Sequence, residues 1–323
     1  MHRRQFVRLA GAAGAASVFA PAVVRSQGSW PERPVKMIVP FAAGGATDLV
    51  ARPWAEVLGK AFNQQFIIEN RGGASGMIGA EAAAKSAPDG YTFFFSSNTA
   101  TVTLPLMRKL TYDAASFMPV ARMGDSMGGF AMHPSVPAKT FKEMIAYAKA
   151  NPGKLTFGSS GPGTLPHLRY EMLRYKTGTD ILHVPYRGGA ETLQDILAGT
   201  IHLMNEASSL PHCKAGKLVL LNMNHTERFA EFPDVPTLTE LGVPDADVPA
   251  WFALYAPGGT PVEIIDRLNA KVREISATPE MKERLQKASA VPVIQTPDEI
   301  RAFMEKDRRS LAELIKVANI KFE

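Results

Sequence analysis

The stretch VKMIVPFAAGGATD, from Val35 to Asp48, decides how the first part of this chain folds. Its first five residues are a largely apolar run of strand length, and Pro40 ends the run. Residues 42–46 are only alanine and glycine, so a ligand can closely approach their backbone N–H groups. Thr47 or Asp48 can then cap a helix that begins at Leu49. A strand, a small-residue loop and a helix N-terminus in this order predict a site for a carboxylate or a similar small anion.

The rest of the chain alternates short apolar runs with helical segments, which indicates α/β layers. Thr140, Thr260 and Thr296 each precede a glutamate by three residues, as in a capping box, and Thr278 precedes a proline that opens a helix. Pro53 falls inside the helix expected after Asp48, so that helix either starts late or bends. The candidate strands are Val35–Val39, Phe66–Glu69, Thr92–Ser96, Val120–Met123, Leu155–Ser159, Ile181–Val184, Leu203–Asn205, Leu218–Asn222 and Trp251–Ala256.

The first 26 residues are expected to be an export signal, because a basic start is followed by an apolar run that is short for a membrane span. The arginine pair Arg3-Arg4 fits a twin-arginine signal, and a Sec signal is the alternative. Cleavage is expected after Ala22 or nearer Ser26. Removal of residues 1–22 lowers the formal charge from +5 to about +2, which does not indicate nucleic acid or an anionic membrane as a partner.

Several kinds of chemistry find no support in the sequence. It contains no phosphate-binding loop, no nucleophile elbow and no histidine spacing typical of a metal site. Cys213 is the single cysteine, so no internal disulfide can form. Its simplest interpretation is that of a small buried residue. We therefore expect neither a metal nor another cofactor. An exported hydrolase that uses Ser159 or Ser160 with His167 stays open as an alternative.

Glu206 follows the apolar run 201–204 and lies at the end of a predicted strand. Such a carboxylate is either solvated or paired with Arg187 or Lys214, or it lines a binding cleft. In the cleft it would accept a hydrogen bond from a ligand hydroxyl or amine and disfavour a second ligand carboxylate.

Three further loops rich in Ser, Thr, Gly or Asn follow predicted strands, at 96–99, 158–164 and 186–190. A single loop of this kind is more often an ordinary connection. Ligands of open α/β sheets bind at the carboxyl ends of strands, so four such loops in one chain favour a cleft.

In order along the chain, these motifs resemble the Bug family, the solute-binding receptors of tripartite tricarboxylate transporters. The resemblance covers essentially the whole chain after the leader. It rests on the segments Pro40–Asp48, Glu69–Gly76, Ala87–Tyr91, Phe157–Gly161, Val184–Ala190, Pro233–Thr237 and Ala256–Pro261. It implies a type II periplasmic-binding-protein fold of two α/β domains around a ligand cleft. Residues 28–124 together with 250–323 would form the first domain, and residues 125–249 the second.

The resemblance also implies the site. The loop at 41–48 would hold a ligand carboxylate, partly through water and backbone groups, and the other loops would complete the pocket. The sequence departs from the family at 202–206, His-Leu-Met-Asn-Glu, where relatives usually have Phe-Asp after Asp-x-Met. The candidate ligand-binding residues are Phe41, Ala43, Gly44, Gly45, Thr47, Asp48, Ser97, Asn98, Ser159, Ser160, Thr164, His167, Tyr186, Gly188, Gly189, Ala190 and Glu206.

The function that follows from the resemblance is that of a periplasmic receptor rather than an enzyme. It would close its domains around a small organic carboxylate and deliver it to a membrane permease, acting as a monomer. A receptor that serves signalling instead of transport is a further alternative. A bulky residue at Gly45 is expected to block the ligand and strain the loop.

Overall fold

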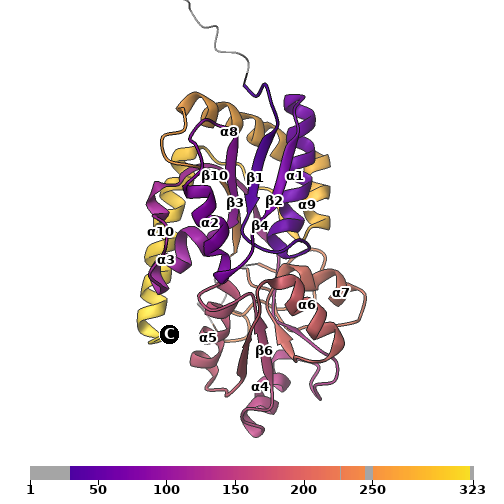
Figure 1. The fold of residues 1–323 in the computed structure, drawn as a ribbon. Coiled ribbons are helices and arrows are strands. Elements are labelled where there is room, and N and C mark those ends of the chain that lie inside the picture. Colours follow the sequence, from indigo (N-terminus) through magenta and orange to yellow (C-terminus); the bar gives the residue numbers. More distant parts are fainter. Residues whose placement is uncertain (1–29, 226, 244–249, 321–323) are drawn as a thin grey trace, which may run out of the picture.

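The computed structural model describes residues 30–225, 227–243 and 250–320, so the expected export signal lies outside the described residues. Figure 1 shows two α/β lobes, one above the other. We call the lobe that holds the larger sheet lobe one and the other lobe two.

Lobe one is built on a six-stranded sheet with the order β11-β4-β10-β3-β1-β2. Strand β1 runs parallel to β2 and β3, whereas β10 is antiparallel to both β3 and β4. The late strand β10 thus lies in the middle of a sheet made mostly by the first third of the chain. The strands are β1 Val35–Val39, β2 Phe66–Asn70, β3 Thr92–Ser97, β4 Met118–Ser126, β10 Trp251–Ala256 and β11 Ala290–Val291.

Helices cover both faces of this sheet, because β1 buries side chains on each side. Val35, Met37 and Val39 enter one apolar cluster with Trp54 of α1, and Ile38 enters the cluster on the opposite face. A central strand that is buried on both faces is typical of parallel α/β sheets. The helices of lobe one are α1 Ala46–Phe62, α2 Met77–Ala84, α3 Leu104–Met107, α8 Val262–Ser276, α9 Pro279–Lys287 and α10 Pro297–Val317, with short turns η1 Ala74–Gly76, η2 Thr99–Thr103 and η3 Ala114–Ser116.

Lobe two has a five-stranded sheet with the order β7-β6-β8-β5-β9. Its strands are β5 Ala131–Met132, β6 Thr156–Ser159, β7 Leu182–Pro185, β8 Leu203–Met204 and β9 Val219–Leu220. Its helices are α4 Phe141–Ala150, α5 Leu165–Thr177, α6 Gly189–Ala198 and α7 Leu210–Lys214, with the turn η4 Ala207–Ser209. The α/β fold with two sheets matches the fold class expected from the sequence. The domain boundaries stay a prediction, and β4 extends to Ser126, beyond the predicted boundary at 124.

The chain crosses between the lobes at two places that lie side by side. It leaves lobe one after β4 and returns at β10, and the Ser126 N–H donates to the Ala250 carbonyl at 2.8 Å. The Trp251 Nε1–H, at the start of β10, donates to Asp307 of α10 at 2.8 Å. These bonds tie the crossing segments to each other and to the last helix.

Three of the four threonine caps are confirmed. Thr140, Thr278 and Thr296 each accept a hydrogen bond from a backbone N–H three residues later, and Thr296 forms a complete capping box with Glu299. The prediction at Thr260 is wrong, because α8 begins at Val262 and the Thr260 hydroxyl donates to the Pro257 carbonyl instead.

The helix after the first strand also differs from expectation. It begins at Ala46 rather than Leu49 and continues through Pro53 to Phe62, so the late start is wrong. The two-residue strands β5 and β11 were not predicted from the sequence.

Candidate functional site

The loop between β1 and α1 is fixed by Asp48. Its carboxylate accepts hydrogen bonds from the Gly44 N–H at 2.9 Å and from Asn70 Nδ2 at 2.9 Å, and it forms an ion pair with Arg52 at 2.8 Å. Gly44 has a φ of +83°, which other residues adopt with strain. The capping prediction is therefore corrected: Gly45 is the N-cap, no side chain caps this end of α1, and Asp48 holds the loop from inside the helix.

Three helix N-termini meet at one place. Helices α1, α5 and α6 start after Gly45, Thr164 and Gly188, and none of these cap residues makes a side-chain hydrogen bond to its own helix. The Thr164 hydroxyl donates instead to the Gly161 carbonyl at 2.7 Å. The first N–H groups of a helix have no partner within the helix and carry a partial positive charge. Their convergence creates a place suited to an anion.

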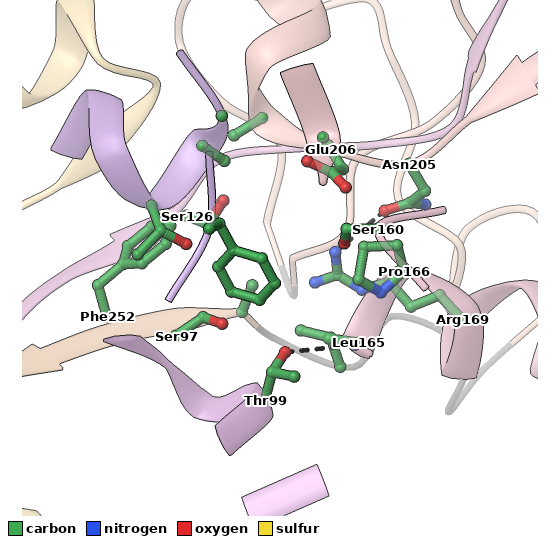
Figure 2. A pocket seen from close by; sticks show the side chains of 17 residues that line it. Ser97, Thr99, Ser126, Ser160, Leu165, Pro166, Arg169, Asn205, Glu206 and Phe252 are labelled. Atoms are coloured by element: carbon green, nitrogen blue, oxygen red, sulfur yellow. Dashed lines mark hydrogen bonds between the residues drawn. The ribbon is translucent and has the colours of Figure 1, made fainter. Parts of the chain in front are cut away.

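A cavity of about 50 Å³ lies where these helices meet, between the two lobes. Lobe one and lobe two both contribute to its wall (Figure 2). The lining residues are Phe41, Gly45, Ala46, Thr47, Ser97, Thr99, Ser126, Ser160, Leu165, Pro166, Arg169, Gly189, Asn205, Glu206, Ala207, Ala250 and Phe252.

Arg169 brings a positive charge to the cavity from α5. Its side chain is buried, and Nη1 donates to the Asn205 Oδ1 atom at 3.0 Å. Asn205 is held in turn by Asn224, whose Nδ2 donates to the same oxygen at 2.6 Å. The guanidinium group therefore has a fixed position at the cavity wall.

Glu206 brings a negative charge from the end of β8. It is 8% exposed, and burial raises the pKa of its carboxyl to about 7, while a hydrogen bond with Ser160 and the charge of Arg169 act in the opposite direction. Among the described residues, its Oε1 atom has no hydrogen-bond partner. Its Oε2 atom packs against Gly189, where an added Cβ would lie only 1.8 Å away. A glycine at 189 is thus needed for the carboxylate to lie beside the start of α6.

The structure brings seven of the predicted site residues to the cavity wall: Phe41, Gly45, Thr47, Ser97, Ser160, Gly189 and Glu206. Other predicted residues stabilise the loops without lining the cavity. Gly44 and Asp48 shape the first loop, Thr164 and Gly188 start their helices, and Tyr186 donates from its hydroxyl to Asp195 at 2.6 Å. The predicted residues outside the cavity lining are Ala43, Gly44, Asp48, Asn98, Ser159, Thr164, His167, Tyr186, Gly188 and Ala190.

The serine and histidine pair of the hydrolase alternative does not come together at the cavity: Ser160 lines it and bonds Glu206, but His167 is not among the lining residues. Ser159 is fully buried, and its Oγ atom lies 2.7 Å from Nε2 of His183 rather than facing a substrate. Burial lowers the pKa of His183 to about 4, which makes it a weak base. His167 stacks on His183 with ring centroids 4.2 Å apart, and its Nδ1 atom accepts from the Gly163 N–H. These contacts give the three residues a packing role.

Sequence reasoning missed Arg169, Asn205, Ser126 and Phe252. One signal was available for Arg169: it follows Leu165 by four residues and precedes Met172 by three, so a charge interrupts the buried face of α5. The others come from strand ends and crossing segments, where the sequence carries no comparable pattern.

Within the described ranges, no group of three or more His, Cys, Asp or Glu side chains is arranged to hold a metal ion. No helix in the same part of the chain is long and apolar enough to cross a membrane.

Comparison with known proteins relates this site to a family. Residues 50–320 match the model of the tripartite tricarboxylate transporter family receptor. Protein BugT of Bordetella pertussis is 35% identical over 303 residues, which cover 92% of this chain and 93% of BugT.

Solved structures agree with this relationship. The periplasmic binding protein BugD has a TM-score of 0.86 and 31% identity, with 91% of this chain and 100% of BugD covered. R. palustris Rpa4515 with adipate has a TM-score of 0.87 and 33% identity, covering 90% and 99% of the two chains. MatC from Rhodopseudomonas palustris with bound malate has a TM-score of 0.83 and 28% identity, covering 88% and 100%.

These findings confirm the resemblance drawn from the sequence motifs. The family and the fold are those of periplasmic solute-binding proteins, not of an enzyme class. By its sequence match and its two-lobed fold, the chain belongs to the tripartite tricarboxylate transporter family of receptors.

Proposed function

We propose that this protein is an exported receptor that captures one small organic carboxylate between its lobes and delivers it to a membrane permease of the tripartite tricarboxylate type. The observation that carries the proposal is the convergence of three helix N-termini and Arg169 on a single inter-lobe cavity. Each helix N-terminus is equivalent to roughly half a positive charge, which favours a carboxylate nearby. Glu206 already lies at the start of α6 and the Leu165 N–H of α5 donates to Thr99, so the N-terminus of α1 is the main place for a ligand carboxylate. The adipate and malate in two relatives support an organic acid as the ligand class.

Capture would proceed by closure of the lobes about the two crossing segments. Hydrogen bonds join the two lobes: the Ser75 hydroxyl of lobe one donates to the Pro162 carbonyl of lobe two at 2.8 Å. The Leu165 N–H of α5 donates to the Thr99 hydroxyl oxygen at 3.4 Å. Hinge closure of this kind needs no cofactor and no covalent chemistry, and one copy of the chain holds the whole cavity.

Native mass spectrometry of freshly purified protein tests the ligand class, because a co-purified small acid adds its mass to the folded chain. Isothermal titration calorimetry with the identified acid then gives the affinity. A pure protein that carries no small acid and binds none from a broad panel of mono- and dicarboxylates would contradict the proposal.

The transport role and the location need separate tests. Crosslinking in cells should capture the permease, and capture of a sensor kinase in its place would favour signalling. Amino-terminal sequencing of the mature protein should begin between residues 23 and 30. Recovery of an intact Met1 end from the soluble cytoplasm would contradict export.

A further inference from the structure

The charged side chains at the cavity wall bear on which carboxylates fit, an inference that rests on the proposed function. We infer that Glu206 and Arg169 select a ligand with one carboxylate and, at its far end, a hydrogen-bond donor such as a hydroxyl or an amine. A dicarboxylate of the same length would be disfavoured.

Glu206 provides the main argument. Its side chain is 8% exposed, it lines the cavity, and within the described residues its Oε1 atom has no partner. A buried polar atom without a partner is costly, and an ionised carboxylate only accepts hydrogen bonds. A ligand hydroxyl or ammonium placed at Oε1 removes this cost, whereas a ligand carboxylate there adds repulsion between like charges.

The positive charge of Arg169 is balanced by the negative charge of Glu206, so the side chains give the cavity no excess of positive charge. It and Glu206 are the charged side chains among the lining residues, and both come from lobe two (Figure 2). When Glu206 is ionised, the net side-chain charge of the wall is therefore zero. The remaining attraction for an anion comes from the helix N-termini, which suits one carboxylate better than two.

The polar groups of lobe one lie at two places around the cavity. Figure 2 shows Ser97 and Thr99 of lobe one across from Glu206 and Arg169 of lobe two. The start of α1, at Gly45, Ala46 and Thr47, also belongs to lobe one. The start of α1 lies close to Glu206, because a Cβ at Gly45 would be 4.0 Å from the Gly189 nitrogen and Glu206 Oε2 lies against Gly189. A carboxylate bound at α1 therefore leaves the far end of a short ligand within reach of Glu206.

Two ligand series of matched length test the inference by calorimetry. The four-carbon series is succinate, 4-hydroxybutyrate and 4-aminobutyrate, and the six-carbon series is adipate, 6-hydroxyhexanoate and 6-aminohexanoate. Within each series only the far end differs. We expect the donor-bearing acids of the series that fits to bind at least tenfold more tightly than the dicarboxylate.

The variant Glu206→Gln keeps the shape and removes the charge. It should weaken the amino acid of that series at least tenfold and strengthen the dicarboxylate. Glu191→Gln is the matched control, since Glu191 is exposed in the first turn of α6 and does not line the cavity. Titration of the unmodified protein at pH 6 and pH 8 gives a second measure: ionisation of Glu206 should strengthen the amino acid and weaken the dicarboxylate as pH rises.

The outcomes separate this inference from the proposed function. If a dicarboxylate binds as tightly as its donor-bearing partners, or if Glu206→Gln behaves like Glu191→Gln, the receptor function stands and the inference is overturned. If none of the six acids binds and mass spectrometry finds no co-purified carboxylate, both fail.

Discussion

At the scale of single residues, the buried carboxylate of Glu206 lowers the stability of the folded protein when it is ionised. Burial of its carboxyl raises the pKa from 4.5 to about 7, so folding takes up a proton between these values. The protonated carboxyl therefore stabilises the folded state fully below pH 4.5. This stabilisation, up to about 3 kcal/mol in the free energy of unfolding, is lost as the pH rises through 7. A binding site often carries such a cost, because the ligand supplies the missing partner.

Glu206→Gln removes this titration and gives a prediction for the unliganded protein. The variant should be more stable than the wild type at pH 8, by about 1–3 kcal/mol, and the margin should shrink toward pH 5. Urea denaturation at both pH values, with Glu191→Gln alongside, measures it. Parallel stability curves for Glu206→Gln and the wild type would show that Glu206 does not titrate in this range.

Gly45 gives a second prediction at this scale and a correction. Its φ is −76°, so valine would not strain the backbone as the sequence suggested; the strained glycine is Gly44. An added Cβ at Gly45 would meet the Ala42 carbonyl at 3.5 Å and the Ala190 nitrogen at 3.8 Å, which are ordinary contacts.

Gly45→Val should therefore lower ligand affinity at least tenfold, about 1.4 kcal/mol, by placing two methyl groups between the first loop and α6. The unfolding temperature should change little. Gly45→Ala is the matched control and should bind within about twofold of wild type in calorimetry. Equal affinity of the valine variant would remove this loop from the ligand site.

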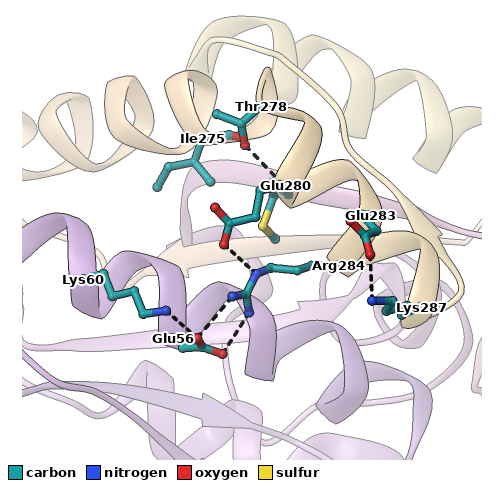
Figure 3. Close-up of polar contacts among 9 residues, drawn as sticks. Glu56, Lys60, Ile275, Thr278, Glu280, Glu283, Arg284 and Lys287 are labelled. Atoms are coloured by element: carbon teal, nitrogen blue, oxygen red, sulfur yellow. Dashed lines mark hydrogen bonds and ion pairs between the residues drawn. The ribbon is translucent and has the colours of Figure 1, made fainter.

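At the scale of elements, α1 has its N-terminus at the cavity and is bonded to α9 through its residue Glu56. Figure 3 shows Arg284 of α9 between Glu56 of α1 and Glu280. Arg284 bonds Glu56 at 2.9 and 3.3 Å and Glu280 at 2.9 Å. Lys60 and Arg284 together lower the pKa of Glu56 to about 2.

Arg284→Gln should lower the melting temperature by less than about 4 °C, since exposed ion pairs contribute little. The difference from wild type should shrink in 1 M NaCl, where charges are screened beyond about 3 Å. Lys287→Gln, which removes a pair confined to α9, is the control. A large loss that salt leaves unchanged would mean that packing, not charge, holds the two helices together.

At the scale of the whole molecule, hydrogen bonds join the two lobes. Ser75 has a φ of +59° within η1, and its hydroxyl reaches the Pro162 carbonyl of lobe two. This hydrogen bond exists only when the lobes are together. It favours the closed form of an equilibrium that ligand binding is proposed to shift.

Ser75→Ala should weaken ligand binding three- to tenfold, about 1 kcal/mol, because closure loses one hydrogen bond and leaves a carbonyl without its partner. Small-angle scattering should show a larger radius of gyration for the unliganded variant than for the wild type. Ser86→Ala is the control, since Ser86 bonds the Ala82 carbonyl within lobe one. Wild-type affinity in Ser75→Ala would show that this contact does not control closure.

The sequence by itself determined what depends on neighbours along the chain. Local patterns predicted the strands at 35–39 and 251–256, the caps at Thr140, Thr278 and Thr296, and the family. Strand period, capping and glycine loops each depend on residues only a few positions apart. The same reasoning fails at Thr260, where the hydroxyl is drawn to a carbonyl of the preceding turn.

Only the tertiary structure decided which side chains face the cavity. Its wall joins residues from Phe41 to Phe252, and Arg169 of α5 reaches it by bonding Asn205 at the end of β8. Candidates such as His167 and Ser159 turn away into packed clusters instead. The direction of a side chain is set by packing between distant elements, and a local sequence pattern does not contain that information.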